Sequence, residues 1–170
     1  MDISTLETYI SKVPDYPKKG ILFYDISTLL SNKLAFKNSI EKMSDRLKNY
    51  DIDKIAAIDA RGFIFGSAIA TVLNLGLIMI RKKNKLPGEV ISYNYDLEYG
   101  SDSLEINSKV GKCNIALVDD LLATGGTARA ACELIKKSGG TVKCFFTLIE
   151  LEFLSGRKLI NVPFETIIKY

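Results

Sequence analysis

The chain has 170 residues, of which 47% are hydrophobic and 25% charged, and its net charge is +3 at pH 7. This composition is typical of one globular domain with a substantial core, and the charge is too small to predict a nucleic-acid partner. No apolar run reaches the ~18 residues of a membrane span, and residues 1–4 lack the features of a secretory signal. We therefore expect a single domain over residues 1–170, located in the cytoplasm and bound to no membrane.

The cysteine and histidine content limits which side chains can bind a metal, form a disulfide or transfer a proton. Cys113, Cys132 and Cys144 lack the spacing of metal ligands, and we expect them to be reduced thiols of a cytosolic protein. The chain has no histidine. Carboxylates, lysine, tyrosine or the substrate itself must therefore carry any proton transfer.

The first 50 residues predict two helices on either side of an irregular segment. A short helix is expected over residues 3–11. Prolines and a glycine then interrupt regular structure within residues 13–26. Ser31 and Asn32 can cap a second helix over residues 36–50, because apolar residues recur there at steps of four and three.

From residue 55 onward, short apolar runs alternate with helical patterns. This alternation predicts an α/β fold, a parallel twisted sheet with helices on both faces. In such a sheet, ligands bind at the carboxyl ends of the strands. Buried strands are predicted over residues 55–58, 77–80, 115–118, 142–151 and 165–168, and helices over residues 62–73, 128–138 and 153–159.

Two adjacent carboxylates and a small-residue loop follow the predicted strand over residues 115–118. Asp119 and Asp120 can accept hydrogen bonds from sugar hydroxyls or help to hold a magnesium ion. In the loop over residues 123–127, glycine allows a ligand to approach the backbone closely, and the helix that follows begins with unpaired N–H groups that favour a phosphate. The alternative is an ordinary strand–turn–helix in which one aspartate caps the helix.

Two other predicted strands end in groups that suit an anion. Asp59-Ala60-Arg61-Gly62-Phe63 can turn backbone N–H groups toward a bound anion, and Arg61 can add a fork of donors. After the strand over residues 77–80, four cations lie within five residues and repel one another unless an anion or solvent screens them. The alternative for the first segment is a plain turn with a surface arginine. The alternative for the second is a solvated basic loop.

Together these segments resemble the type I phosphoribosyltransferases. Residues 118–127 are similar to the phosphoribosyl-pyrophosphate motif of that family, without a departure. Residues 81–88 are similar to a basic segment of its purine-salvage members. Residues 97–100, between the two ribbon arms predicted at 90–95 and 104–106, together with residues 104–105 of the second arm, resemble the catalytic lid of the adenine phosphoribosyltransferase branch. The similarity extends, in family order, from a hood near residue 16 to residue 150.

The resemblance implies a purine-salvage transferase that moves 5-phosphoribosyl from phosphoribosyl pyrophosphate to adenine, giving AMP and pyrophosphate. It implies Mg²⁺ as cofactor, held mainly through the substrate with no certain protein ligand, and a homodimer. It also implies a hood over about residues 13–26, a flexible lid over about residues 93–105, and a cis peptide at Asp59–Ala60.

The resemblance also assigns roles to single residues. Tyr24 departs from the family, which usually has Arg or Lys at this position, and this puts any side-chain contact there in doubt. Phe23 can instead be a plain core residue, and the separate roles of the two aspartates stay open. The implied set is Glu98, Asp120 and Asp119 for catalysis; Asp119, Asp120, Ala123, Thr124, Gly125, Gly126 and Thr127 for ribose 5-phosphate; Ala60, Arg61, Arg81, Lys82 and Lys85 for pyrophosphate; and Leu22, Phe23 and Tyr24 for adenine.

Two other functions stay open at this point. One is a sister enzyme that uses hypoxanthine, guanine or xanthine. The other is a non-catalytic regulator that binds phosphoribosyl pyrophosphate or purines. Regulators of this kind carry a DNA-binding domain, and about 15 residues before the hood are too few for one.

Overall fold

The structure is a computed structural model that describes residues 1–97, 100–107 and 110–170. The chain forms two compact units, Met1–Lys42 and Met43–Tyr170. No helix in the described ranges is both long enough and apolar enough to cross a membrane.

The first unit contains short helices and one strand pair. Residues 13–26, expected to be irregular, instead contribute to a two-stranded antiparallel sheet in which Val13 pairs with Phe23. The expectation was wrong because the prolines fall at the end of one strand and in the loop, where no ladder N–H is needed. The elements are α1 (Ile3–Glu7), β1 (Ser11–Pro14), β2 (Leu22–Asp25), α2 (Ser27–Ser31) and the start of α3 (Lys33–Leu47).

The predicted cap of α3 is confirmed. Asn32 Oδ1 accepts hydrogen bonds from the backbone N–H groups of Leu34 and Ala35, each at 3.0 Å. These are two of the donors that a helix start leaves without an intrahelical acceptor.

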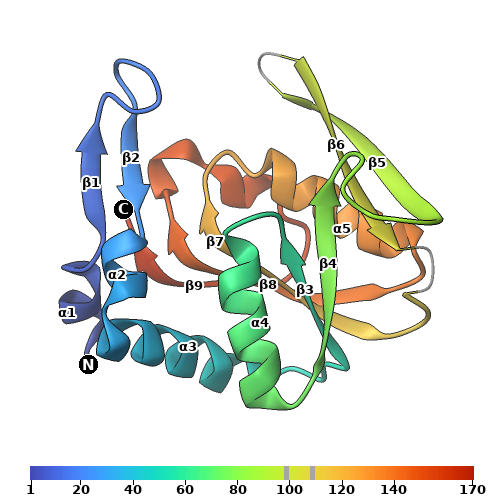
Figure 1. The fold of residues 1–170 in the computed structure, drawn as a ribbon, viewed down its shortest axis with the longest axis horizontal. Coiled ribbons are helices and arrows are strands. Elements are labelled where there is room, and N and C mark those ends of the chain that lie inside the picture. Colours follow the sequence, from blue (N-terminus) through green and yellow to red (C-terminus); the bar gives the residue numbers. More distant parts are fainter. Residues whose placement is uncertain (98–99, 108–109) are drawn as a thin grey trace. The chain divides into compact units, whose positions relative to one another are not determined.

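The second unit is built on a seven-stranded sheet of order β5-β6-β4-β3-β7-β8-β9 (Figure 1). Its five central and C-terminal strands are parallel, whereas β5 and β6 form an antiparallel ribbon that pairs with β4 in the antiparallel sense. The sheet is therefore mixed rather than wholly parallel. Its strands are β3 (Lys54–Ile58), β4 (Gly76–Lys82), β5 (Val90–Leu97), β6 (Gly100–Asn107), β7 (Asn114–Leu122), β8 (Thr141–Glu150) and β9 (Phe164–Lys169).

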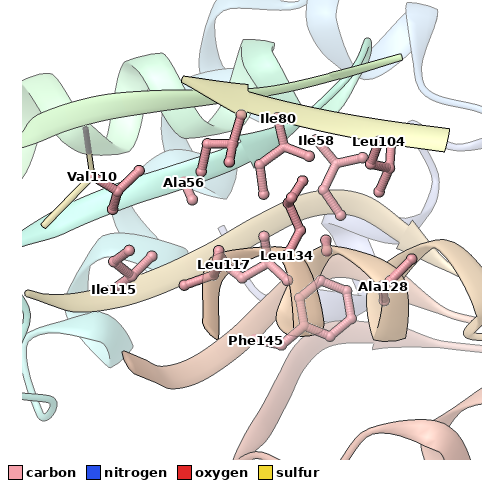
Figure 2. Close-up of a cluster of buried hydrophobic side chains, with 14 of the residues drawn as sticks. Ala56, Ile58, Ile80, Leu104, Val110, Ile115, Leu117, Ala128, Leu134 and Phe145 are labelled. Atoms are coloured by element: carbon pink, nitrogen blue, oxygen red, sulfur yellow. The ribbon is translucent and has the colours of Figure 1, made fainter. Parts of the chain in front are cut away.

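Helices α4 (Gly62–Leu73) and α5 (Gly126–Lys137) cover opposite faces of this sheet. Gly66 of α4 packs so closely that an added Cβ would lie 2.5 Å from the Cβ of Ala57. The neighbouring residue Ala56 points to the other face, because side chains alternate along a strand. There it joins a buried cluster with Leu134 of α5 (Figure 2). The prediction of helices on both faces is confirmed.

Several elements of the second unit differ from the expectation. β4 runs on to Lys82, so the first two cations of the basic segment lie on a strand. The described part of the polar segment 96–103 is strand, because β5 and β6 pair as far as Leu97 and Gly100. The single helix expected over residues 153–159 is two 3₁₀ turns, η1 (Glu152–Leu154) and η2 (Gly156–Leu159), separated by Ser155 with φ 54°.

Candidate active site

A cavity of about 510 Å³ lies at the carboxyl ends of β3, β4 and β7. This is the edge at which parallel α/β sheets bind ligands. All of its lining belongs to the second unit. From the residues predicted by sequence, the lining contains Ala60, Arg61, Lys82, Asp119, Asp120, Ala123, Thr124, Gly125, Gly126 and Thr127.

The loop over residues 123–127 turns directly from β7 into α5. Gly125 is the N-cap of α5 with φ 87°, in the left-handed region that glycine tolerates best. The helix begins at Gly126, two residues earlier than predicted. The backbone N–H of Arg129 donates a 2.9 Å hydrogen bond to the carbonyl oxygen of Gly125, the N-cap residue. The N–H groups of the first turn have no intrahelical acceptor, so this end of α5 suits a phosphate.

Asp119 and Asp120 both line the cavity. Asp119 is half-buried and Asp120 is 4% exposed. Burial raises the pKa of the Asp119 carboxyl well above its usual range, and the charge of Asp120 raises it further. Burial also raises the pKa of Asp120, against the opposing effect of the Arg61 guanidinium.

Arg61 faces this acid pair. Its Nε lies 2.9 Å from Asp120 Oδ2. Asp119 Oδ1 accepts a 2.9 Å hydrogen bond from the backbone N–H of Asp120. The same oxygen lies against the start of α4, because an added Cβ on Gly62 would come within 2.9 Å of it. A glycine at this position therefore lets the helix start approach the acid pair.

The basic segment divides into two parts. Lys82 lines the cavity, and its Nζ lies 3.5 Å from Asp102 Oδ2. Arg81 instead binds the end of β3, with Nε 3.1 Å from Asp59 Oδ2, and its Nη1 donates to the Lys85 carbonyl at 3.4 Å. Arg81 and Lys85 lie outside the cavity lining.

Sequence analysis did not single out Tyr95 and Asp102, which also line the cavity. The phenol oxygen of Tyr95 is 3.4 Å from Asp102 Oδ2. Burial raises the pKa of Tyr95. Burial also acts to raise the pKa of Asp102, but the Ser103 N–H and the Lys82 ammonium leave it lowered. The missed signal was strand register, since Tyr95 and Asp102 are direct partners on β5 and β6.

The remaining predicted residues fall outside the described residues or in the first unit. Glu98 lies outside the described residues. Leu22, Phe23 and Tyr24 belong to β2 of the first unit, where Leu22 is exposed, Phe23 is half-buried and Tyr24 is 6% exposed. The Phe23 ring packs edge-on against Tyr16, with the ring centroids 5.1 Å apart.

The carboxylates of Asp119 and Asp120 provide the oxygen donors that Mg²⁺ prefers. Within the ranges that the structure describes, no group of three or more acidic, cysteine or histidine side chains is placed to hold a metal. The Asp59–Ala60 peptide bond is cis, as the sequence resemblance implied.

Comparison with known proteins gives consistent matches. A family model described as the phosphoribosyl transferase domain matches residues 25–152. A protein of Halothermothrix orenii named adenine phosphoribosyltransferase is 52% identical over 158 residues, which is 92% of this chain and 93% of that protein. The solved adenine phosphoribosyltransferase of Thermoanaerobacter pseudethanolicus has a TM-score of 0.96 at 43% identity, with 99% of both chains covered. That of Saccharomyces cerevisiae, in complex with adenine and an imino-altritol bisphosphate, has a TM-score of 0.91 at 34% identity, with 97% of both chains covered.

Proposed function

The chain belongs to the adenine phosphoribosyltransferases of the phosphoribosyltransferase family, and from this premise we propose how its own residues carry out the reaction. It is a purine-salvage enzyme that transfers 5-phosphoribosyl from phosphoribosyl pyrophosphate to adenine, giving AMP and pyrophosphate. The observation that supports our residue assignments most directly is the cavity in which a phosphate-binding helix start, two carboxylates and two cations meet.

The 5-phosphate of the substrate binds at residues 123–127. Backbone N–H groups at the start of α5 and the hydroxyls of Thr124 and Thr127 supply the donors. The ribose lies next to Asp119 and Asp120, whose carboxylates accept bonds from its hydroxyls. The 5-phosphate is thus assigned to the start of α5, and the ribose to the end of β7 that precedes the loop.

The pyrophosphate binds on the opposite side of the acid pair, at Ala60, Arg61 and Lys82. Arg61 and Lys82 now face Asp120 and Asp102, respectively, so the leaving group has to draw each cation from a carboxylate. Arg81, which is paired with Asp59, and Lys85 lie outside the cavity lining, and we propose that they act on the pyrophosphate at longer range.

Asp120 faces the positive charge that develops on the sugar when the bond to pyrophosphate breaks. Asp119, which hydrogen-bonds the backbone of Asp120, holds the ribose hydroxyls. Mg²⁺ would be held by substrate oxygens, water and one of these two carboxylates. When bound, it would offset negative charge on the leaving pyrophosphate.

Adenine recognition falls to Leu22, Phe23 and Tyr24, and proton handling at the purine falls to Glu98. The sequence similarity of the hood and of the lid to the adenine branch supports both assignments. We propose that the whole chain acts as one phosphoribosyltransferase domain, with the hood over residues 13–26 and the lid over residues 93–105.

An exposed apolar surface on α4 and β4 supports a homodimer. Val72 of α4 is 55% exposed and Met79 of β4 is 43% exposed. Ile64 and Leu77, on the same two elements, are also exposed. Leu77 and Met79 point to the sheet face that α4 covers, since they are register partners of Ile55 and Ala57. A second copy of the chain would remove this surface from water.

Free thiols support a reducing compartment, for which we propose the cytoplasm. Cys113, Cys132 and Cys144 all lie in the described part of the chain and are free cysteines. Burial raises the pKa of the Cys132 and Cys144 thiols to about 12 in each case, which keeps them in the unreactive thiol form.

The deciding experiment incubates the protein with phosphoribosyl pyrophosphate, Mg²⁺ and each common purine in turn, and identifies the nucleotide formed. We expect AMP from adenine and much slower turnover of guanine, hypoxanthine and xanthine. Omission of Mg²⁺ should abolish turnover. Comparable rates with guanine or hypoxanthine would contradict the adenine assignment.

A further inference from the structure

Gly125 of the phosphate loop and Gly156 of η2 are in direct backbone contact. A Cβ added to Gly125 would lie 2.5 Å from the carbonyl oxygen of Gly156 and 3.1 Å from its carbonyl carbon. A Cβ added to Gly156 would overlap the carbonyl oxygen of Ala123 and lie 2.8 Å from the carbonyl carbon of Thr124. Both glycines are buried. The phosphate loop therefore rests on the η2 backbone, with no room for a side chain between them.

An ion pair between a buried carboxylate and a half-exposed guanidinium holds η2 in this position. Glu150, at the end of β8, is 3% exposed, and its Oε1 lies 3.1 Å from Arg157 Nε. The Arg157 guanidinium also stacks over the ring of Phe164, 4.7 Å from the centroid. A buried carboxylate is costly without a compensating charge, so Glu150 fixes Arg157 and, with it, the adjoining Gly156.

The segment that leads to η2 is also bound to the strand that carries the acid pair. Leu151 N donates to the carbonyl of Leu122, the last residue of β7, at 2.9 Å. Within the segment, Lys158 N donates to Ser155 O at 3.1 Å. The phosphate loop therefore leaves a strand end that is bonded to the start of this segment and then contacts the segment again at Gly156.

We propose that Gly156 and Arg157 are positioning residues for substrate binding, in that they hold the Ala123–Gly125 backbone in the conformation that receives the 5-phosphate. This inference rests on the proposed phosphate site. Both residues lie beyond the matched domain region 25–152, so the C-terminal segment completes a site whose ligating groups all come from earlier in the chain. A loop fixed before binding loses less conformational freedom when the phosphate arrives.

Such a role predicts an effect on one substrate. The 5-phosphate is bound alike in the ground state and in the transition state, so a displaced loop should raise KM for phosphoribosyl pyrophosphate and leave kcat largely intact. KM for adenine should not rise, because the residues proposed to bind adenine lie on another segment of the chain. General loss of folding would instead reduce the active fraction and leave both KM values unchanged.

The first test is Gly156→Ala, with Gly76→Ala as the matched control. A Cβ on Gly76 would meet only Lys54 Cγ, at 3.7 Å, which is an ordinary contact. We expect Gly156→Ala to raise KM for phosphoribosyl pyrophosphate about 10-fold or more, since small displacements of positioning groups have effects of this size. KM for adenine should stay within about twofold, a change too small for a lost binding contact. The control should change neither constant.

The second test keeps the inference falsifiable if Gly156→Ala does not fold. Arg157→Ala removes the partner of Glu150 and should raise KM for phosphoribosyl pyrophosphate, whereas Arg157→Lys should restore part of the loss. Folded variants with unchanged KM for phosphoribosyl pyrophosphate, or with equal rises for both substrates, would overturn the inference. A wild-type protein that forms no AMP would contradict the proposed function instead, so the two failures are distinguishable.

Discussion

The phenol oxygen of Tyr95 lies 3.4 Å from Thr127 Oγ1, which joins the β5–β6 ribbon to the phosphate loop. Figure 1 shows this ribbon as a long two-stranded arm at the edge of the sheet. Tyr95 also reaches Asp102, and Asp102 reaches Lys82 on β4. A short polar chain thus connects the proposed phosphate and pyrophosphate subsites along the ribbon that contains the proposed lid.

The Tyr95–Thr127 contact predicts coupled effects of two substitutions. Thr127→Ala should raise KM for phosphoribosyl pyrophosphate, because it removes a phosphate donor that acts in ground state and transition state alike. Tyr95→Phe should raise the same KM several-fold, on the order of one lost hydrogen bond. The double variant should be less impaired than the sum of the two single effects. Steady-state kinetics on the four proteins, with Tyr93→Phe as control, gives the coupling, and strict additivity would show that the two residues act independently.

Asp120→Asn should lower kcat. We propose that this carboxylate faces developing positive charge, and an interaction that strengthens in the transition state appears in kcat rather than in KM. We expect a loss of about 10²-fold, in the range of a removed electrostatic stabiliser. Steady-state kinetics, with each substrate varied to saturation in turn, shows whether the substitution changes kcat or KM. A rise in KM with intact kcat would mean that the roles of Asp119 and Asp120 are exchanged.

Glu98→Gln should lower kcat with adenine by about 10²-fold, within the usual range for lost acid–base catalysis. Glu98→Leu should be as slow or slower. Binding of phosphoribosyl pyrophosphate to either variant, measured by titration calorimetry, should change little, because the proposed contacts lie at residues 60–61, 82 and 119–127. Near-full kcat in Glu98→Gln would leave proton handling to solvent or to the pyrophosphate.

Asp119→Asn should stabilise the free protein while it weakens catalysis. Burial, then the charge of Asp120, raises the pKa of Asp119 above its unfolded value, so its ionisation destabilises the fold as pH rises above that unfolded value. Removing the charge should raise Tm at pH 7 by about 2–4 °C for each ~1 kcal/mol gained.

This gain should fade as the pH falls toward the unfolded pKa of the carboxyl, because Asp119 is then protonated in the folded and unfolded states alike. Thermal unfolding at a series of pH values measures it. Asp45→Asn, at a residue whose side chain is 68% exposed, is the control. A variant less stable than wild type at pH 7 would show that Asp119 is a net stabilising residue.

Local patterns predicted some elements closely. Helix α4 begins and ends at the predicted residues 62 and 73, because a run of small and apolar residues stops at Asn74, which takes the left-handed conformation. The ribbon was predicted less well. Residues 96–103 have the polar composition of a loop, whereas the pairing of the described ones depends on the register of the β5–β6 hairpin, which composition does not report.

The candidate site shows the same division. The phosphate loop could be predicted because its residues are contiguous and the chemistry follows from their order. The contact between Gly125 and Gly156 could not, since the two glycines meet only through the packing of η2. The basic segment was predicted as one cluster, but Arg81 binds Asp59 and leaves Lys82 at the cavity.

The Arg61–Asp120 ion pair makes ligand binding and proton uptake mutually dependent. Arg61 lowers the pKa of Asp120 against the effect of burial. An anion that draws Arg61 away removes this influence, and Asp120 then binds a proton more readily. By reciprocity, a protonated Asp120 releases Arg61 to the anion. We therefore expect the affinity of the proposed pyrophosphate site for a pyrophosphate-like anion to increase as the pH falls toward the pKa of Asp120, even where the charge of the anion itself stays constant.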